Sequence, residues 1–494
     1  MTAVAASTAL VTRSPVSITA DPKRVLARLF VPGQEHLIDL ESRSTGVLAR
    51  ILALPEDAVE STLRDVRQRW DSRHRDLPGI MAAHYEVISH RIPDVGPLSE
   101  ARKGLIGAVF THEFSNEGAA LFNPSPVLHP DQSDVEDGAV RFVMSVRAVG
   151  EGHLSSVGFR TGVLGPGQAL QLDDPGPHIE GGTVVPPEYD RALFAARLEE
   201  EGADAESTRF LLGTLPQTFH QDDLWASLSA LSGQRLTRQG AVHTDELARR
   251  IARCTYDVEF SPDSGLAERV LWPEAPTESV GIEDVRLVRF VEDDGGVSYR
   301  GTYTAFDGAQ IAPQTIETLD FRTFRMSQLA GPTAKNKGFA LFPRRIAGRY
   351  VALSRWDRES NTVTTSADGR VWDEGHTLHT PGRTWDIIQS GNCGSPIETE
   401  AGWLVLTHGV GPMREYAIGA LLLDLHDPTR VIGDLGEPLL CPTEEERDGY
   451  VPNVVYSCGG LLHGDQLLLP YGASDASIRF AFVDVPGLLD RMTR

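Results

Sequence analysis

A pair of adjacent carboxylates and a nearby arginine interrupt the segment ESVGIEDVRLVRF, residues 278–290, which otherwise has the apolar pattern of a strand. The charged residues are Glu283, Asp284 and Arg286. Removing such groups from water is costly unless a site uses them. A neighbouring guanidinium lowers the pKa of a carboxylate, whereas burial beside a second carboxylate raises it, so the pair is expected to hold a proton near neutral pH. Asp284 is the predicted acid.

Other polar side chains stand at the ends of short hydrophobic runs, at intervals that match successive hairpins. They are Asn123, Arg147, Lys337, Arg355, His408 and Asp475. Any one of them alone is better explained as a surface or turn residue, and His408 as a hydrogen-bonded core histidine. A β-propeller, however, gathers the inner strands of all its blades around one axis. Their recurrence therefore favours a common pocket.

Helical patterns occur in two parts of the chain. Residues 1–20 are rich in small and polar residues and are expected to form a loose tail. The segment TGVLARILALPEDAVESTLRDVRQRW spaces its apolar residues three and four apart, with Pro55 opening a second helix. It predicts an α-helical N-terminal extension over residues 21–105. A second helical stretch, residues 186–254, has no linker-like composition and is predicted to be an insertion.

Short apolar runs separated by Gly-bearing turns fill the remainder, residues 106–494. A strand, a tight turn and a second strand are predicted for RFVEDDGGVSYRGTYTAF, LFPRRIAGRYVALSR, IETEAGWLVLTHGV and GGLLHGDQLLLPYGASD. Hairpins without crossover helices leave a sandwich, a barrel or a propeller, in a mainly β fold. Spacing favours the propeller. The segment SADGRVW, residues 366–372, resembles the Ser-x-Asp-Gly turn that closes blades in some sugar-cleaving propellers.

The composition is that of a folded globular protein, with 41% hydrophobic and 23% charged residues in a chain of 494. A net charge of -23 argues against nucleic acid or an anionic membrane as partner, so an anionic substrate needs a local basic pocket. The 4 cysteines show no CxxC spacing, which predicts neither a zinc site nor a disulfide framework. Together with the absence of a signal peptide pattern, this favours a cytoplasmic location.

Five motifs in register resemble glycoside hydrolase family 130, the β-mannoside phosphorylases and β-mannosidases. They are GIEDVR, FALFPRRIAGRYVALSR, SPIETEAGWLVLTHGV, YAIGALLLDLHDPTRVIGDLGEPLL, and GYVPNVVYSCG followed by YGASD. The resemblance runs from about Asn123 to the C-terminus. It implies a five-bladed β-propeller with the active site at its axis, and an inverting single displacement at a β-mannosidic bond.

The resemblance also implies roles for residues around the sugar. Asp284 would be the general acid, acting through a sugar hydroxyl that relays its proton to the glycosidic oxygen. The mannose beside it would be held by Asn123, Arg147 and Asp475. The further expected substrate-binding residues are Glu283, Arg286 and Tyr416.

Phosphate, the nucleophile of the phosphorylase members, would be bound by Lys337, Arg355 and His408. Two departures weaken this site: Gly338 replaces an Asn that phosphorylases usually carry, and Gln389 stands where a Lys is expected. Losing a cation about 4 Å from a phosphate oxygen removes up to ~4 kcal/mol of attraction at an effective dielectric constant near 20. Arg355 still offers a bidentate fork, to which Lys337 and a protonated His408 would add. Three of four basic positions remain, which favours phosphorolysis.

Three functions are therefore weighed. The first is phosphorolysis of a β-mannoside to α-mannose 1-phosphate, or its reverse. The second is an inverting β-mannosidase that uses water, with Glu398 or Asp386 as the base only because they flank Gln389. The third is a non-catalytic carbohydrate-binding propeller, which predicts decay of an acid motif that is intact here.

The expected ligands are a β-mannoside oligosaccharide and inorganic phosphate as co-substrate. No Rossmann glycine pattern, P-loop or HExxH is present, so no cofactor and no catalytic metal are expected. The helical extension could form a subunit contact in a homo-oligomer. Linkage and acceptor are set by loops on the acceptor side, of which the insertion at residues 186–254 is one candidate.

Overall fold

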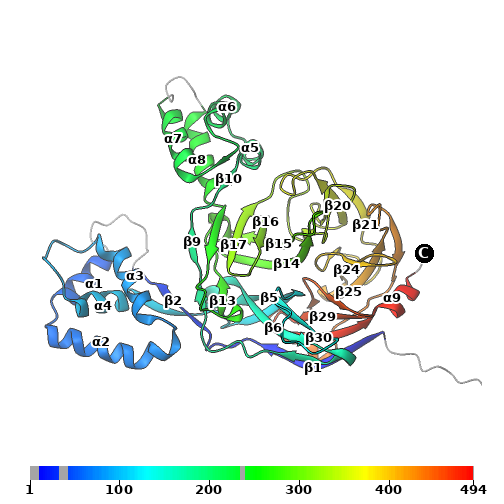
Figure 1. Cartoon of the computed structure of the whole chain (residues 1–494), viewed down its shortest axis with the longest axis horizontal. Helices are drawn as coiled ribbons and strands as arrows, with labels where there is room; N and C mark the ends of the chain where they lie inside the picture. The colour runs from blue at the N-terminus through cyan, green and yellow to red at the C-terminus, as the bar shows by residue number, and fades with distance from the viewer. Residues whose placement is uncertain (1–9, 33–42, 234–239, 493–494) are drawn as a thin grey trace, which may run out of the picture. The chain divides into compact units, whose positions relative to one another are not determined.

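The computed structural model describes residues 10–32, 43–233 and 240–492 and is mainly β with several helices (Figure 1). The chain divides into two compact units. The smaller unit consists of Asp21–Gly118 and Gly176–Gly181, and the larger unit contains the rest. Within the described ranges, no helix is both long enough and apolar enough to cross a membrane.

In its described residues, the smaller unit combines four α-helices with one pair of antiparallel strands. Its elements are β2 (Val25–Leu29), α1 (Arg43–Leu52), α2 (Glu56–Trp70), α3 (Leu77–Ser89), α4 (Glu100–Val109) and β3 (Thr111–Ser115). Pro55 immediately precedes α2, as predicted, and Ser99 caps α4 by accepting a hydrogen bond from the backbone N–H of Arg102. Leu48, Ile106 and other apolar residues of these helices share one core. The segment predicted to be helical over residues 21–105 thus also contains the strand β2, whose partner β3 lies beyond residue 105.

The larger unit contains five groups of antiparallel strands, which follow one another along the chain. The first is β4 (Ala120–Leu128), β5 (Val140–Val149), β6 (Ser155–Leu164) and β7 (Leu170–Leu172), and the second is β14 (Gly281–Val291), β15 (Val297–Phe306), β16 (Ile311–Thr318) and β17 (Thr323–Gln328). These two groups belong to one 12-stranded sheet, because β6 and β14 pair in parallel at Ser155 and Gly281. The third is β18 (Ala340–Leu341), β19 (Tyr350–Ser354), β20 (Asn361–Ser366) and β21 (His376–His379). The fourth is β22 (Gln389–Asn392), β23 (Ile397–Thr399), β24 (Gly402–Val410), β25 (Tyr416–Leu423) and β26 (Val431–Asp434). The fifth is β27 (Val455–Tyr456), β28 (Leu461–His463), β29 (Gln466–Ala473) and β30 (Ser477–Asp484). The four hairpins predicted from Gly-bearing turns are confirmed as β14–β15, β18–β19, β23–β24 and β28–β29.

Hydrophobic cores lie between neighbouring groups. Phe159 of the first group packs with Ile282 of the second, and Phe290 of the second with Tyr350 of the third. Further cores join Val351 to Val405, Leu404 to Leu467, and Phe480 to Phe142, and so link the third group to the fourth, the fourth to the fifth, and the fifth to the first. Each group therefore packs on the next, and the last packs on the first. The strands need apolar residues on both faces to do this, as β24 and β25 have.

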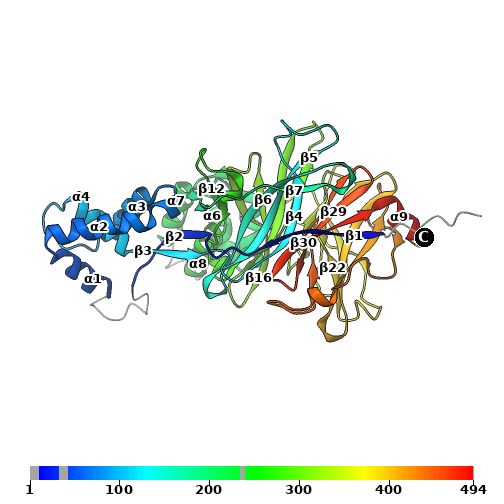
Figure 2. The same cartoon turned by 90° about the horizontal axis from the view of Figure 1, so that it is seen from below.

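The N-terminal residues differ from the loose tail expected over residues 1–20. Residues 1–9 lie outside the described part, but β1 (Val11–Thr19) pairs antiparallel with β30 at the other end of the chain, so the blue and red strands lie side by side in Figures 1 and 2. The pairing breaks register between Arg13 and Ser17, where Pro15 stands. Proline is tolerated in such an edge strand, but it hides the strand pattern from sequence analysis.

The described part of the insertion predicted at residues 186–254 contains four α-helices and a short pair of antiparallel strands. They are β10 (Tyr189–Asp190), α5 (Arg191–Glu200), α6 (Ala205–Thr214), β11 (Thr218–Phe219), α7 (Gln221–Ser232) and α8 (Ala241–Ala252). Asp190 caps α5 by accepting a hydrogen bond from the backbone N–H of Leu193. Two contacts tie the insertion to the strand groups: Glu200 accepts a hydrogen bond from the Gly331 N–H, and Asp190 pairs with Arg370 at 3.0 Å.

The SADGRVW segment forms the tight turn after β20. The Asp368 carboxylate accepts hydrogen bonds from the backbone N–H groups of Arg370 and Val371 at 2.8 and 2.9 Å. Gly369 takes a φ of 77°, which glycine adopts without steric cost. Trp372 is buried between the second and third strand groups, so this turn also helps to join them.

Candidate active site

The predicted acid lies at a bulge in a buried strand. Strand β14 carries Glu283, Asp284 and Arg286, and its pairing with β15 breaks register between Glu283 and Arg286. Asp284 takes a φ of 54°, in the left-handed region that non-glycine residues seldom occupy. The bulge re-aims the side chain of Asp284 relative to its neighbours on the strand. This explains how a buried strand carries three charged residues in four positions.

Two further predicted site residues share this unusual backbone conformation. Asn123 has a φ of 52° at a register break in β4, and Asp475 has a φ of 48° in the turn between β29 and β30. Aspartate and asparagine tolerate the left-handed region better than most residues, but each such position still costs roughly 1–3 kcal/mol. Backbone strain of this kind clusters at functional sites.

Hydrogen bonds and ion pairs join the residues expected around the sugar. Asn123 Nδ2 donates to Asp284 Oδ1 at 2.9 Å, and Arg147 Nη1 donates to the same oxygen at 3.3 Å. Arg147 Nη2 also donates to Glu283 Oε1 at 2.6 Å, and Lys337 Nζ pairs with the other oxygen of Glu283. The first two strand groups and the segment after β17 thus meet at the carboxylate pair.

The electrostatics of Asp284 differ from the expectation that burial beside Glu283 keeps a proton on the pair. Burial raises the pKa of Asp284, but the positive charges of Arg147, Lys337 and Arg286 outweigh it, and the pKa lies below its ordinary value. Burial and the charge of Asp284 instead raise the pKa of Asp475 to about 7, against the opposing effect of Arg147. The proton that is held near neutral pH is therefore on Asp475.

Arg286 braces the backbone at the acid. It is almost fully buried, donates through Nη1 to the backbone carbonyl of Asp284 at 2.9 Å, and donates through Nη2 to the Tyr456 hydroxyl at 2.7 Å. Sequence reasoning missed Tyr456, although it lies in the motif GYVPNVVYSCG. Its position in this motif was the only sign of a functional role, because a tyrosine at the end of a strand is common in any β protein.

Three of the four residues expected to bind phosphate form a second connected cluster together with Tyr416. The fourth, Lys337, pairs with Glu283 instead. Arg355 Nη1 lies 3.4 Å from His408 Nε2, and Gln389 Nε2 donates to the Tyr416 hydroxyl at 3.4 Å. The rings of His408 and Tyr416 are stacked, with centroids 6.0 Å apart. We refer to Arg355, Gln389, His408 and Tyr416 as the basic cluster.

His408 does not carry the positive charge expected of it. Burial, together with the charges of Arg355 and Arg286, lowers the pKa of His408 well below its ordinary value. The neutral ring donates from Nδ1 to the backbone carbonyl of Asn392 at 3.2 Å, which leaves Nε2 to accept from Arg355. His408 thus orients the Arg355 guanidinium. Sequence reasoning also missed Asn392, whose Nδ2 donates to the Gly338 carbonyl at 2.5 Å.

Tyr456 connects the basic cluster to the carboxylates. Its hydroxyl accepts from Arg286, and its ring meets His408 edge-on with centroids 4.9 Å apart. The backbone at Gly338 lies against the side chain of Arg355, because a Cβ on this glycine would stand 3.5 Å from Arg355 Cβ. The predicted sugar and phosphate residues therefore form one continuous site.

The two carboxylates considered as a base for water are engaged elsewhere. Glu398 is a surface residue that pairs with Arg344 at 2.6 Å. Asp386 is fully buried and accepts hydrogen bonds from His379 and from the backbone N–H groups of Gly382 and Arg383. Among the described residues, no group of His, Cys, Asp and Glu is arranged to hold a metal ion.

Comparisons with known proteins identify the family of the chain. The family model of glycoside hydrolase family 130, described as beta-1,4-mannooligosaccharide phosphorylase, matches residues 263–494. A beta-1,2-mannobiose phosphorylase of Listeria innocua is 31% identical over 251 residues, which cover 49% of this chain and 68% of the relative. A 1,2-beta-oligomannan phosphorylase of Thermoanaerobacter sp. is 33% identical over 232 residues, which cover 44% of this chain and 74% of the relative.

A solved structure also aligns with most of the chain. It is the beta-1,2-mannobiose phosphorylase of Listeria innocua in complex with beta-1,2-mannobiose. The alignment covers 81% of this chain and 95% of the solved chain, with 22% identity and a TM-score of 0.45.

Proposed function

Since the chain belongs to glycoside hydrolase family 130, we propose that it is an inverting β-mannoside phosphorylase. It converts a β-mannoside and inorganic phosphate into α-mannose 1-phosphate and the shortened acceptor. The relatives named above are phosphorylases of β-mannosides. One observation carries the proposal: Tyr456 accepts a hydrogen bond from Arg286, next to the predicted acid, and its ring contacts His408 of the basic cluster. The predicted acid and the predicted anion site are thereby adjacent.

A five-bladed β-propeller is the architecture that we propose for the larger unit. Support comes from the packing, since each of the five strand groups packs on the next and the last on the first. The site supports it as well, because Asn123, Asp284, Arg355, His408 and Tyr456 come from five different groups or their connections. A propeller places such residues around its axis.

The reaction requires a nucleophile and an acid on opposite sides of the sugar. A phosphate oxygen attacks the anomeric carbon while the glycosidic carbon–oxygen bond breaks, and the leaving oxygen takes a proton that Asp284 supplies through a sugar hydroxyl. Asp284 must therefore be protonated in the productive complex. A bound sugar removes water from this carboxylate and a phosphate adds negative charge near it, and both changes favour its protonated form.

The anion site differs from the one expected because His408 is neutral. Arg355 and Lys337 supply the positive charge, His408 orients Arg355, and Gln389 offers an amide donor. Lys337 is shared with Glu283, so phosphate competes with this carboxylate for the ammonium group. We infer that phosphate binds here with fewer charge-assisted contacts than in a site with the additional lysine.

The proposal is tested by incubating the purified protein with short β-mannosides of different linkages, with and without inorganic phosphate. Mannose 1-phosphate that forms only with phosphate is the expected product. Free mannose formed at the same rate with and without phosphate would contradict the proposal and identify a hydrolase. The Asp284→Asn variant serves as the control for catalysis by this site, with an expected loss of roughly 10²–10⁴-fold in rate.

A further inference from the structure

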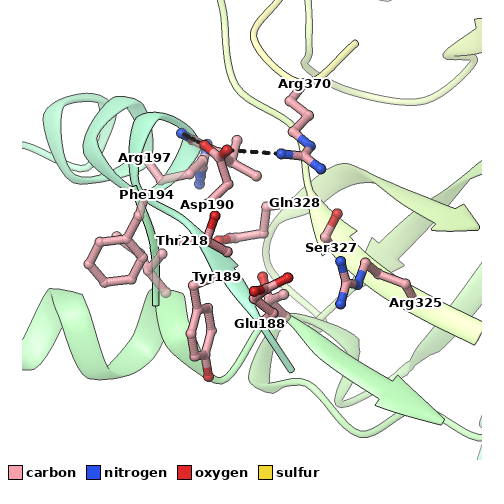
Figure 3. Close-up of a pocket in the computed structure, with 13 residues that line it drawn as sticks. Glu188, Tyr189, Asp190, Phe194, Arg197, Thr218, Arg325, Ser327, Gln328 and Arg370 are labelled. Atoms are coloured by element: carbon pink, nitrogen blue, oxygen red, sulfur yellow. Dashed lines mark hydrogen bonds and ion pairs between the residues drawn. The ribbon is translucent and has the colours of Figure 1, made fainter. Parts of the chain in front are cut away.

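A pocket outside the candidate active site lies between the insertion and strand β17 (Figure 3). It encloses about 140 Å³. One side is formed by β10 and α5 of the insertion, and the other by β17 and the turn after β20. The residues that matter for its chemistry are Glu188, Asp190, Arg197, Arg325, Gln328 and Arg370. None of them belongs to the carboxylates or the basic cluster described above.

The insertion side of the pocket is a fixed apolar wall. Tyr189 is buried, stacks on Phe219 with ring centroids 5.2 Å apart, and donates its hydroxyl to the Ala252 carbonyl at 3.3 Å. Phe194 meets Phe219 edge-on at 5.4 Å. Such packing holds the wall in place without a ligand, as in most pre-formed small-molecule sites.

The three arginines in the pocket are already neutralised. Arg370 pairs with Asp190 at 3.0 Å, Arg325 with Asp257 at 3.1 Å, and Arg197 with Glu201 at 2.7 Å. Glu188 adds a further carboxylate to the lining. The pocket therefore has no excess positive charge to attract a phosphate or another anion.

Gln328 points to a polar ligand. Its side chain is 7% exposed and makes no hydrogen bond to any residue in the described part of the chain. Figure 3 shows it reaching into the pocket from β17, toward Thr218 and Asp190. Buried amides are normally hydrogen-bonded, so an amide left without a protein partner in a pocket is available to a ligand. An amide has two donors and an acceptor, which suit a group that both donates and accepts.

We propose that this pocket binds one neutral sugar ring. Each sugar hydroxyl both donates and accepts, which matches the mixture of amide, carboxylate and guanidinium groups on the lining. The volume of about 140 Å³ is below the roughly 300–1,000 Å³ of pockets for drug-sized ligands, so it suits a single ring. That the sugar is mannose rests on the proposed function, because the proposed substrate is made of mannose units. The preference for a neutral sugar rests on the residues that line the pocket.

The test is saturation-transfer NMR on the full chain with methyl α-mannoside, a neutral sugar that has no β-mannosidic bond to cleave. Asp475→Asn should weaken sugar binding at the active site, so that the effect of a second substitution on the remaining binding reports on the pocket. Gln328→Ala, made in the same background, removes the free amide without breaking a protein hydrogen bond. Gln310→Ala is its matched control, since Gln310 is an exposed glutamine in the turn before β16.

We expect saturation transfer to persist in Asp475→Asn, to weaken at least tenfold in affinity when Gln328→Ala is added, and to be unchanged when Gln310→Ala is added. Mannose 6-phosphate, the anionic probe, should bind the Asp475→Asn variant at least tenfold more weakly than methyl α-mannoside. Loss of all binding in Asp475→Asn, equal binding with and without Gln328→Ala, or tighter binding of the anion would each overturn the proposal.

Phosphorolysis by the Gln328→Ala single variant separates this inference from the proposed function. Its kcat/KM on a mannobiose should stay within about twofold of the unaltered protein, because Gln328 lies outside the catalytic residues. If the unaltered protein does not perform phosphorolysis but the pocket still binds the neutral sugar, the proposed function fails and the sugar site stands. If phosphorolysis occurs but the pocket binds nothing, only the sugar site fails.

Discussion

Asn123, Asp284 and Asp475, which come from three different strand groups of the candidate active site, hold left-handed backbone conformations. At roughly 1–3 kcal/mol each, these conformations cost a substantial part of the 5–15 kcal/mol by which proteins are usually stable. Strained conformations of this kind cluster at active sites and ligand clamps, so they support a functional use of these three residues.

Several residue-level expectations depended on packing that no local sequence pattern contains. The sequence named the residues of the site, and the structure brings them together. The expectation that the carboxylate pair holds a proton near neutral pH does not hold for Asp284, whose pKa is lowered because Arg147 and Lys337 approach it from distant segments. The positive charge expected on His408 was wrong as well, since burial beside Arg355 and Arg286 keeps the ring neutral.

Asp475→Asn should make protein stability less dependent on pH. Burial raises the pKa of Asp475 from 3.8 to about 7, so the folded protein holds a proton that the unfolded chain releases between these values. Ionisation of Asp475 in the folded protein therefore lowers the free energy of unfolding as pH rises through that window. The loss is complete above pH 7, at up to about 4 kcal/mol. Asparagine has no such cost. Urea unfolding should show Asp475→Asn more stabilised relative to the unaltered protein at pH 8 than at pH 4.

The matched control for this measurement is Asp448→Asn, which changes an exposed aspartate. It should change stability equally at both pH values. An equal effect of Asp475→Asn at pH 4 and pH 8 would show that Asp475 ionises normally in the folded protein.

Gln389→Lys should tighten phosphate binding, because it restores a cation beside the basic cluster. An added charge about 4 Å from a phosphate oxygen contributes up to ~4 kcal/mol at an effective dielectric constant near 20, so the KM for phosphate should fall by on the order of tenfold or more. Steady-state kinetics at saturating mannoside measure it, with Gln310→Lys as a control for the added charge. An unchanged KM for phosphate would place the anion away from Gln389.

Arg355→Ala should raise the KM for phosphate far more than the KM for the mannoside. Arg355 is the guanidinium that His408 orients, and bidentate guanidinium contacts are among the strongest that proteins make with phosphate. Initial rates at varied phosphate and varied mannoside separate the two constants. Equal increases in both would mean that Arg355 supports the fold and does not bind phosphate.

At the scale of elements, local sequence patterns were sufficient to predict a strand wherever it pairs with the next strand in the sequence. The predicted hairpins and the helical insertion are present because Gly-bearing turns and helical spacing act over a few residues. Strand β1 was missed because its partner, β30, stands at the far end of the chain. Its pattern, broken by Pro15, gives no local signal of that pairing.

Gly331 is the residue at which the insertion, the segment after β17 and the turn after β20 meet. Its N–H donates to Glu200, and a Cβ at this position would lie 2.0 Å from the carbonyl oxygen of Trp372. Gly331→Ala should therefore lower the melting temperature, since both the φ of 111° and the overlap are unfavourable.

Gly348→Ala is the matched control, because Gly348 also has a positive φ, 76°, but a Cβ there would meet nothing within 4 Å. Gly331→Ala should lower the melting temperature clearly more than Gly348→Ala. Equal losses would mean that the segment beside Trp372 shifts freely to accommodate a side chain at position 331.

At the scale of the molecule, the order of packing from the first strand group to the fifth and back is what brings distant residues to one site. Sequence periodicity indicated hairpins but not how many groups they form or that the last meets the first, since this depends on buried contacts such as Phe480 with Phe142. The resemblance to a family supplied that expectation. The helical smaller unit gave no catalytic motif, and none of the proposed site residues lies in it.

The most direct test of the central claim is phosphorus-31 NMR of the early products from a mannobiose and inorganic phosphate. We expect α-mannose 1-phosphate to accumulate first, with inorganic phosphate consumed in step, and Asp284→Asn to abolish the signal over the same period. A first mannose phosphate with the β configuration, or no mannose phosphate ester at all, would contradict inverting phosphorolysis at this site.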